Sequence, residues 1–214
     1  MWKLALTLLL PAEAKACGVA LALIVDVSGS INQGEYQYQM RGLAEALLDP
    51  TVRDALVSEQ AALTLIQWGS HARQKVVLPW TVMRDDAAVA DFARRSRIAP
   101  REWFVTSTAI GSALRFTGEY FASAPLCQRH VIDVSGDGPS NDGTLTWQMR
   151  DELVARGIVI NGIAIEDSVV NVTAYYKANV IGGFGSFVLT TESYEDYPRA
   201  IRRKLINEVT KPAS

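Results

Sequence analysis

The sequence predicts an α/β domain built on a mainly parallel six-stranded sheet, with one antiparallel edge strand and helices on both faces. Apolar, β-rich runs alternate along the chain with amphipathic segments of helical period. The runs are apolar at consecutive positions, which is typical of parallel strands covered by helices on both sides. No stretch rich in Pro, Gly and Ser divides the 214 residues, so we expect one domain with a full core.

Six strands are expected in order along the chain. They are residues 19–25, 62–68, 74–80, 130–135, 158–165 and 186–191. Only GSHAR separates the second run from the third, which predicts a hairpin and therefore an antiparallel edge strand. Helical segments separate the other runs, as parallel pairing requires. In such sheets, ligands bind beyond the carboxyl ends of the strands, where the strand order reverses.

The amphipathic segments between these runs predict six helices. They are residues 33–48, 84–97, 109–123, 144–156, 169–179 and 194–209. In the first, Tyr36, Met40, Leu43 and Leu47 share one face, and Asn32 is placed to cap the N-terminus.

The charge balance argues against a dedicated nucleic-acid-binding protein. The chain has 21 Lys and Arg against 23 Asp and Glu, whereas nucleic-acid binders normally show a basic excess or a basic face. One local basic cluster lies in the last helical segment, and we expect it to form a solvated helix face rather than a phosphate-binding patch. It consists of Arg199, Arg202, Arg203 and Lys204. We expect the apolar face of the same helix to pack against the domain. It consists of Ile201, Leu205 and Val209.

The first sixteen residues, MWKLALTLLLPAEAKA, have the pattern of a signal peptide. Lys3 precedes an apolar run, and AEA or AKA resembles a cleavage site. The run is shorter than the ~20 residues that span a bilayer, and no other stretch is a candidate span. The alternative is a first strand or helix of the fold, but Pro11 and the polar AEAK separate the run from the next one. We therefore expect residues 17–214 to form an exported domain, either periplasmic or secreted.

The chain has two cysteines, Cys17 and Cys127, and each lies directly before or near the start of a predicted strand. Neither lies in a C-x-x-C motif or near a histidine at metal-ligand spacing, so zinc is not expected. If the two strands are parallel neighbours, the thiols meet at one edge of the sheet, and in an oxidising compartment they can form a disulfide. We expect this disulfide. Two free buried thiols and lipid attachment at Cys17 are the alternatives.

The first predicted strand ends in LIVDVSGSIN, where Asp26, Ser28 and Ser30 alternate after the apolar run. Alternate residues in an extended turn point to one side, so these oxygens can converge on one point. Hard oxygen ligands suit Mg²⁺, Ca²⁺ or Mn²⁺. Because only one of the three side chains is charged, a bound divalent ion needs a carboxylate from another loop.

Two further loops offer oxygen ligands at the same expected edge of the sheet. SGDGPSND places Asp137 just beyond the fourth strand, and VTSTAIGSAL offers Thr106 and Thr108 before a helix. Taken singly, an aspartate or threonine in a loop is more often a turn or cap residue than a ligand. Their joint placement favours a metal site.

In this order, DVSGS, TAIGSAL and SGDGPS resemble the three loops of the metal-ion-dependent adhesion site (MIDAS) of von Willebrand factor type A (vWA) domains, which have a Rossmann-like fold. Longer phrases such as LPWT, RHVIDVSGDGPSNDG and GIVINGIAI resemble, more closely, a bacterial family of exported A-like proteins of unknown function. The resemblance covers nearly all of the chain after residue 17. It implies the vWA fold and a metal-ligand set consisting of Asp26, Ser28, Ser30, Thr108 and Asp137.

Three positions qualify this resemblance. In the resembling domains, the threonine ligand lies six residues before a leucine of the following helix. Leu114 is that leucine here, which selects Thr108 rather than Thr106 as the ligand. Gly136 stands where a threonine commonly precedes the acidic residue of the third loop. Asp133, in the second DVSG, lies inside a strand, and we expect it to be a buried polar residue bonded to a neighbouring loop rather than a ligand.

In the resembling domains, the metal accepts a carboxylate from a partner protein. The resemblance therefore implies a non-enzymatic, monomeric protein-binding module that uses Mg²⁺, or Mn²⁺ or Ca²⁺. We expect no nucleic-acid partner and no stable membrane span. Trp103 and Phe104 lie just before Thr108 and are candidates for an apolar rim beside the metal.

The alternatives are a metal-dependent hydrolase or phosphoryl-transfer enzyme that uses Asp26, and a metal-free structural domain. Catalysis would need a general acid or base near Asp26, but His71 lies in the hairpin and His130 at the far end of its strand. The sequence has no G-x-S-x-G elbow. The GGFG at residues 182–185 precedes a strand instead of opening a helix, which argues against dinucleotide binding.

Overall fold

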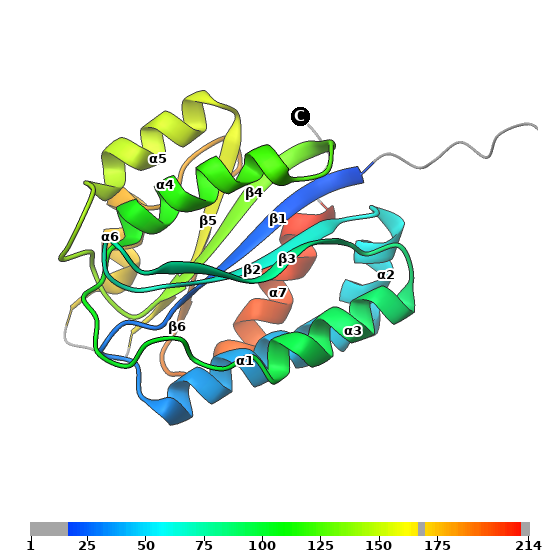
Figure 1. Cartoon of the computed structure of the whole chain (residues 1–214), viewed down its shortest axis with the longest axis horizontal. Helices are drawn as coiled ribbons and strands as arrows, with labels where there is room; N and C mark the ends of the chain where they lie inside the picture. The colour runs from blue at the N-terminus through cyan, green and yellow to red at the C-terminus, as the bar shows by residue number, and fades with distance from the viewer. Residues whose placement is uncertain (1–16, 167–169, 211–214) are drawn as a thin grey trace, which may run out of the picture.

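The computed structural model describes residues 17–166 and 170–210, which form a six-stranded sheet with helices on both faces (Figure 1). The predicted signal peptide, residues 1–16, lies outside the described residues. The strands are β1 (Cys17–Asp26), β2 (Ala62–Trp68), β3 (Gln74–Val82), β4 (Cys127–Gly136), β5 (Ile158–Ile165) and β6 (Val188–Thr191).

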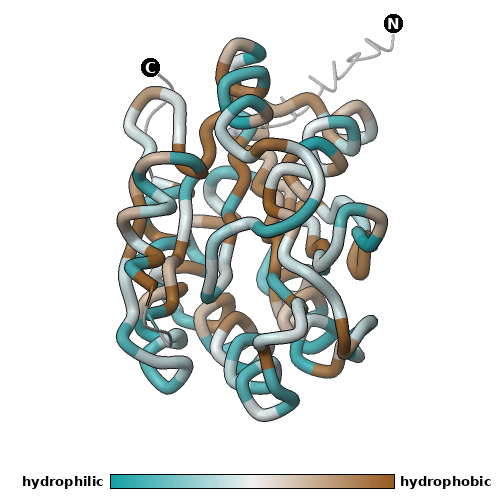
Figure 2. The backbone as a smooth tube through the Cα atoms, turned by 90° about the vertical axis from the view of Figure 1, so that its left-hand side faces the viewer, coloured by the Kyte–Doolittle hydropathy of each residue, from teal (hydrophilic) through white to brown (hydrophobic). Residues whose placement is uncertain are grey.

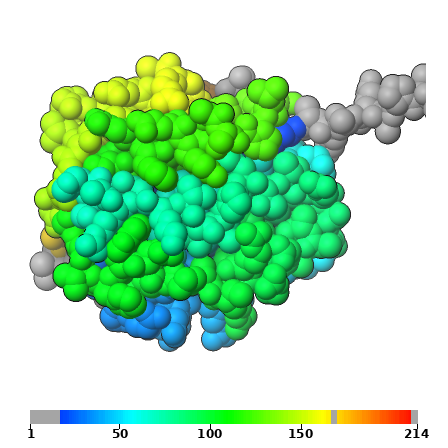
Figure 3. Space-filling view, viewed as in Figure 1, coloured from blue at the N-terminus to red at the C-terminus, as the bar shows by residue number. Residues whose placement is uncertain are grey.

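The sheet has the order β3-β2-β1-β4-β5-β6, and every neighbouring pair is parallel except β2 with β3. The predicted fold class is confirmed, including the antiparallel edge strand. In Figure 3, β3 lies on the surface between α4 (Ile110–Tyr120) and α3 (Asp86–Arg97). The strand order reverses between β1 and β4, so the loops after these two strands meet at the edge where such folds bind ligands.

The helices form two layers. The remaining ones are α1 (Gln33–Leu48), α2 (Pro50–Ser58), α5 (Thr146–Ala155), α6 (Val172–Asn179) and α7 (Tyr197–Thr210), with a short 3₁₀ turn at Phe121–Ser123. Helices α1, α2, α3 and α7 cover one face of the sheet, and α4, α5 and α6 cover the other (Figure 1).

Each face of the sheet has its own apolar core, as strand alternation requires. In β1, Leu21, Leu23 and Val25 face the α1 and α7 layer, whereas Ala22 and Ile24 face the α4 and α5 layer. Figure 2 shows apolar strands in the interior and polar loops around them. The strand is buried along its whole length, which explains its uninterrupted apolar sequence.

The six predicted helices are present, but several begin two or three residues later than predicted. Asn32 caps α1 as expected: its side chain accepts hydrogen bonds from the N–H groups of Gly34 and Glu35, and the Glu35 carboxylate accepts one from the Asn32 N–H. Helix α2 was not predicted. Its sequence signal is Asp49-Pro50, a capping aspartate followed by a proline at the first helical position.

Helix α7 confirms one expectation and corrects another. Ile201, Leu205 and Val209 pack into the core as predicted. The basic cluster is not a uniform solvated face, because Lys204 is completely buried. Arg202, by contrast, is partly exposed and forms an ion pair with Asp49. Side chains at positions three and four apart share a helix face, so Lys204 follows Ile201 onto the buried side.

Cys17 and Cys127 lie opposite each other at the start of the β1–β4 ladder and form a disulfide. The expected pairing is therefore present, and neither cysteine is a free thiol. Among the described residues, no helix is long and apolar enough to cross a membrane.

Replacing both cysteines by serine should lower the free energy of unfolding by about 2–5 kcal/mol, because the bond restricts the unfolded chain. The two cysteines are 110 residues apart, so the bond closes a long loop. Urea unfolding followed by circular dichroism measures the difference. Wild-type protein reduced with dithiothreitol is the control and should match the variant, whereas equal midpoints for oxidised wild type and variant would contradict the expectation.

Candidate metal-binding site

The loop after β1 turns sharply around the side chain of Asp26. The Ser28 N–H donates to Asp26 Oδ1 at 2.7 Å, and the Ile31 N–H donates to the Ser28 carbonyl at 3.2 Å. The Val27 N–H still donates to the Trp68 carbonyl of β2 at 2.9 Å. The turn is therefore anchored to the sheet on one side and to the Asp26 carboxylate on the other.

Four of the five predicted ligands are brought together at this edge. Ser28 Oγ lies 3.2 Å from Ser30 Oγ, and Ser30 Oγ donates to Asp137 Oδ1 at 2.9 Å. Asp26 and Asp137 are close enough for the charge of Asp137 to raise the pKa of Asp26. The loops after β1 and β4 thus present two hydroxyls and two carboxylates to one point, as the sequence predicted.

The loop between α3 and α4 joins this group through its backbone. The Thr106 carbonyl accepts the Gly29 N–H at 2.9 Å, and the Thr108 carbonyl accepts the N–H of Asn141 at 2.8 Å. The Thr108 N–H donates to the Asn141 side chain at 2.9 Å. Thr108 is buried at the edge of the group, but within the described residues no hydrogen bond joins its hydroxyl to the other four candidates. The Thr106 hydroxyl is directed toward Gly69 and has no hydrogen-bond partner.

The electrostatics of the site favour a bound cation. Asp26 is fully buried, and its Oδ2 has no hydrogen-bond partner. Burial raises the pKa of Asp26 well above its usual value, and the neighbouring Asp137 raises it further. A buried, unpaired carboxylate oxygen is costly, and a divalent cation with oxygen preference would satisfy it. The described residues contain no group of three or more His, Cys, Asp or Glu side chains placed to hold a metal. The candidate ligands are instead hydroxyls together with two carboxylates, which are hard oxygen ligands.

Gly136 has a steric role here. A Cβ at this position would lie 2.8 Å from the Tyr176 hydroxyl and 2.9 Å from Asp26 Oδ2. The Tyr176 hydroxyl is itself buried and without a hydrogen-bond partner. The departure from the usual threonine therefore has a physical reason, because Tyr176 of α6 fills the space that a side chain at 136 would need.

Two supporting residues were not predicted. The Tyr194 hydroxyl donates to Asp137 Oδ2 at 3.1 Å. The buried Arg101 guanidinium donates to the Ser28 carbonyl at 2.9 Å and to the Val27 carbonyl at 3.2 Å, which holds the first loop. These residues lie far apart in the sequence without a motif, so nothing in the sequence alone pointed to them.

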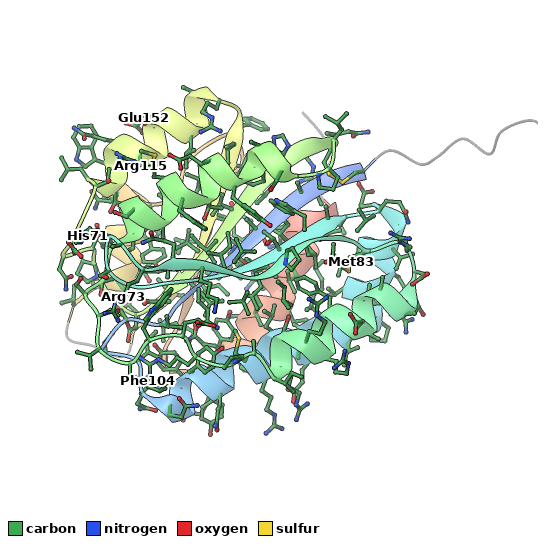
Figure 4. The ribbon with its side chains drawn as sticks, in the orientation of Figure 1. His71, Arg73, Met83, Phe104, Arg115 and Glu152 are labelled. Atoms are coloured by element: carbon green, nitrogen blue, oxygen red, sulfur yellow. A yellow bond between two sulfur atoms is a disulfide. The ribbon has the colours of Figure 1, made fainter. Side chains whose placement is uncertain are left out.

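The rim of the site is partly apolar. Phe104 and Val105 are 62% and 86% exposed, and the Phe104 ring lies 5.2 Å from the Arg101 guanidinium carbon. Figure 4 shows Phe104, His71 and Arg73 at the same end of the molecule, away from Met83. Trp103, also considered for the rim, is half-buried and packs against the core instead.

Residues 16–213 match a protein-family model described as "Protein of unknown function (DUF1194)". The chain belongs to this family. A search of the curated proteins found no match to the sequence.

Solved structures place the DUF1194 chain in a known fold. Proximal thread matrix protein 1 from the mussel byssus, with a zinc-occupied MIDAS motif, matches with a TM-score of 0.68 at 20% identity, covering 92% of this chain and 49% of that one. The vWA domain of the pilus tip protein Mfa5 from Porphyromonas gingivalis matches with a TM-score of 0.65 at 10% identity, covering 94% and 99%. A von Willebrand factor type A protein from Catenulispora acidiphila matches with a TM-score of 0.65 at 15% identity, covering 91% and 43%.

These likenesses show the fold, which is that of a vWA domain. The DUF1194 chain spans about half the length of the mussel protein that it matches. The predicted family resemblance is confirmed.

Gly136→Ala should destabilise the domain by about 1–3 kcal/mol, because the added methyl overpacks a closed site. The matched control is Gly138→Ala, where an added Cβ meets no atom within 4 Å. Urea unfolding of both variants measures the difference. Combining Gly136→Ala with Tyr176→Phe removes one of the two close contacts and should recover part of the loss. Equal stability of the 136 and 138 variants would contradict the steric account.

Proposed function

We propose that this domain is a non-enzymatic, divalent-metal-dependent protein-binding module whose metal accepts an acidic side chain from a partner. The observation that carries the proposal is the convergence of Asp26, Ser28, Ser30 and Asp137, with one buried Asp26 oxygen left without a partner. Thr108 is proposed as the fifth ligand, from the loop that is bound to both of the others through its backbone.

The donor set supports Mg²⁺, with Mn²⁺ or Ca²⁺ as substitutes. All proposed ligand atoms are oxygens, and only two of the five side chains carry charge, so a bound divalent ion keeps part of its electrophilic character. Three hydroxyls and two carboxylates leave room in a six-coordinate shell for a ligand from outside. A zinc-occupied MIDAS motif in the mussel protein supports metal binding by this fold.

The surroundings of Asp26 favour binding over hydrolysis. His71 is held by Asp142, whose Oδ2 lies 3.0 Å from His71 Nδ1, and His130 lies near the start of β4, beside the Phe121 ring. Neither is placed to act as a general acid or base at Asp26. The Ser30 hydroxyl donates to the carboxylate of Asp137 and not to a histidine, so the Ser–His pair typical of serine nucleophiles is not formed among the described residues.

The partner is proposed to be a protein that offers a carboxylate, with apolar contacts to the exposed Phe104 and Val105. We propose that the domain acts as a monomer outside the cytoplasm, in the periplasm or secreted. The disulfide supports an oxidising compartment.

Mg²⁺ should bind the purified, chelator-treated protein, and Asp26→Asn should weaken this binding by roughly 10-fold or more. Replacing a residue that only hydrogen-bonds to a metal ligand already lowers metal affinity by about that factor, and Asp26 is proposed to be a ligand itself. Isothermal titration calorimetry measures this. The control is Asp196→Asn, which changes an exposed carboxylate paired with Arg199. Indistinguishable titrations for wild type and Asp26→Asn would overturn the metal site. Thr108→Val should weaken binding while Thr106→Val should not, and equal losses would contradict the choice of Thr108.

Peptides selected on the immobilised, Mg²⁺-loaded protein from a random display library should be enriched in Asp or Glu, because the open metal position prefers a carboxylate. Elution with a chelator isolates the metal-dependent binders. A selection on Asp26→Asn is the control and should give no such enrichment. Recovery of peptides without acidic residues, or of equal sets from both proteins, would contradict the proposed partner chemistry. Asp26-dependent turnover of phosphoester substrates would instead favour an enzyme.

A further inference from the structure

A second group of ionisable side chains lies between α7 and the centre of the sheet, away from the metal-site loops. Lys204 of α7, Asp133 of β4 and Glu208 of α7 are 0%, 2% and 1% exposed. Lys204 Nζ lies 2.6 Å from Asp133 Oδ1 and 2.5 Å from Glu208 Oε1. One amine therefore contacts two carboxyl groups in the interior. The expectation that Asp133 would be bonded to a neighbouring loop is wrong, because its partner is a helix side chain.

Two further residues, Asn161 and Phe187, flank the cluster. Asn161 of β5 donates from Nδ2 to Glu208 Oε1 at 2.8 Å, and its Oδ1 accepts the Phe187 N–H at 3.0 Å. The Phe187 ring centroid lies 5.6 Å from Lys204 Nζ. The amine is thus surrounded by two carboxyl groups, an amide and an aromatic ring.

The contact between Lys204 and Asp133 differs from an ordinary ion pair. Although Nζ is 2.6 Å from Oδ1, neither oxygen of Asp133 has a partner in hydrogen-bonding geometry. The exposed pair of Lys75 and Glu102, at 2.7 Å, does form such a hydrogen bond. A buried ion pair repays its desolvation only when its geometry is good and its remaining lone pairs are satisfied. Asp133 meets neither condition.

The protonation of the two acids fits a reactive cluster. Burial raises the pKa of Asp133, and burial together with the charge of Asp133 raises the pKa of Glu208 to about 7. Because one protonated amine can neutralise only one carboxylate, we expect at least one of the two acids to stay protonated. Transfer of a further proton from the amine to Asp133 leaves both neutral, and a dry interior favours neutral forms over charged ones.

We propose that Lys204 and Asp133 form an intramolecular amide bond that joins α7 to β4, with Glu208 as the residue that transfers the proton. In this reaction, the unprotonated Nζ attacks Asp133 Cγ while Asp133 is in its carboxylic acid form. Glu208, in its carboxylic acid form, gives its proton to the departing hydroxyl and takes up the proton released by the attacking nitrogen, so it ends the reaction as it began. The N–C bond forms, the C–O bond breaks, and one water leaves. No oxidant, reductant or further reactant is needed.

The packing supplies what this condensation requires. Holding amine and acid in contact replaces a bimolecular encounter by an intramolecular one, which can be worth an effective concentration of about 10⁵ M or more. Glu208 touches the attacking nitrogen and is placed for general acid–base catalysis. A cavity of about 560 Å³, lined in part by Glu208 and Asn161, adjoins the cluster and offers a route for the released water.

Asp133 is a better acceptor than the two other carbonyl groups of the cluster. Glu208 Oε1 and the Asn161 amide are bonded to each other, and Asn161 is further held by the Phe187 N–H. Both oxygens of Asp133 lack a partner in hydrogen-bonding geometry, whereas in Glu208 only Oε2 does, and Asp133 lies on a central strand of the sheet. Its carbon is therefore free to become tetrahedral.

The bond would add a second covalent connection to β4. Cys127 already joins β4 to β1 at one end of the strand. With a second bond at Asp133, a pulling force applied between residues 17 and 204 would follow a short covalent path. It would pass from Cys17 through the disulfide to Cys127, along β4 to Asp133, and through the new bond to Lys204. The remainder of the domain, including the metal-site loops, would carry none of it.

Mass spectrometry of the purified, reduced protein tests the proposal directly. The expected mass is lower than that of its sequence by one water, with the N-terminus determined independently. Tryptic digestion should give a branched peptide joining residues 130–150 to residues 204–214, because an acylated Lys204 resists cleavage. Lys75 and Glu102 serve as the internal control and should remain unlinked. A mass equal to that of the sequence overturns the proposal.

Variants assign the roles. Lys204→Arg keeps the positive charge but not the nucleophilic amine, and should show the full mass of its sequence. Asp133→Asn should lose ammonia in place of water, and Glu208→Gln should remain mostly unlinked. A link from Lys204 to Glu208 or Asn161, or a mass deficit that persists in Lys204→Arg, would overturn the assignment to Asp133. The mass of the wild-type protein decides the proposal by itself, so the test still stands if one of the variants fails to fold.

Discussion

The parallel pairing of β1 with β4 is the constraint on which the rest of the structure depends. It runs from Cys17 opposite Cys127 to Val25 opposite Ser135. At one end it brings the two thiols together, and at the other it places the loops that follow Asp26 and Gly136 side by side. Because both strands are buried at the centre of the sheet, their register cannot slip without exposing one of the two apolar cores. A single ladder thus sets the disulfide and the candidate metal site.

Two groups of buried charged side chains lie at this ladder, and they differ in where the positive charge comes from. At the carboxyl ends of the strands, Asp26 and Asp137 lie close together, and the buried Arg101 nearby donates to backbone carbonyls of the first loop. We propose that this site takes a cation from solution. On the α7 side, Lys204 provides the cation from within the chain and faces Asp133 and Glu208. In the proposed function, the first site exchanges its ion with the solution. The second is flanked by Asn161 and Phe187, and we propose that it forms a permanent link.

Two tyrosines from other elements support the candidate metal site, one from α6 and one from the segment just before α7. Tyr176 of α6 reaches the backbone of Gly136, and Tyr194, just before α7, binds Asp137. Both tyrosines have a pKa raised by burial, so they remain neutral hydroxyls beside the carboxylates. The candidate site is therefore assembled from loops after two strands and supported by residues that belong to other elements.

The sequence by itself determined the class of fold, the succession of apolar strands along the chain, the hairpin, the capping of α1 by Asn32 and the oxygen-bearing residues of the candidate site, because these depend on local pattern and on strand ends. It missed α2, whose signal was only Asp49-Pro50, and it assigned Lys204 to solvent. The pairing of Lys204 with Asp133, the support of Asp137 by Tyr194 and the need for glycine at 136 were decided only by the tertiary structure. Each depends on which side chains from distant segments share a buried space, and no local periodicity encodes that.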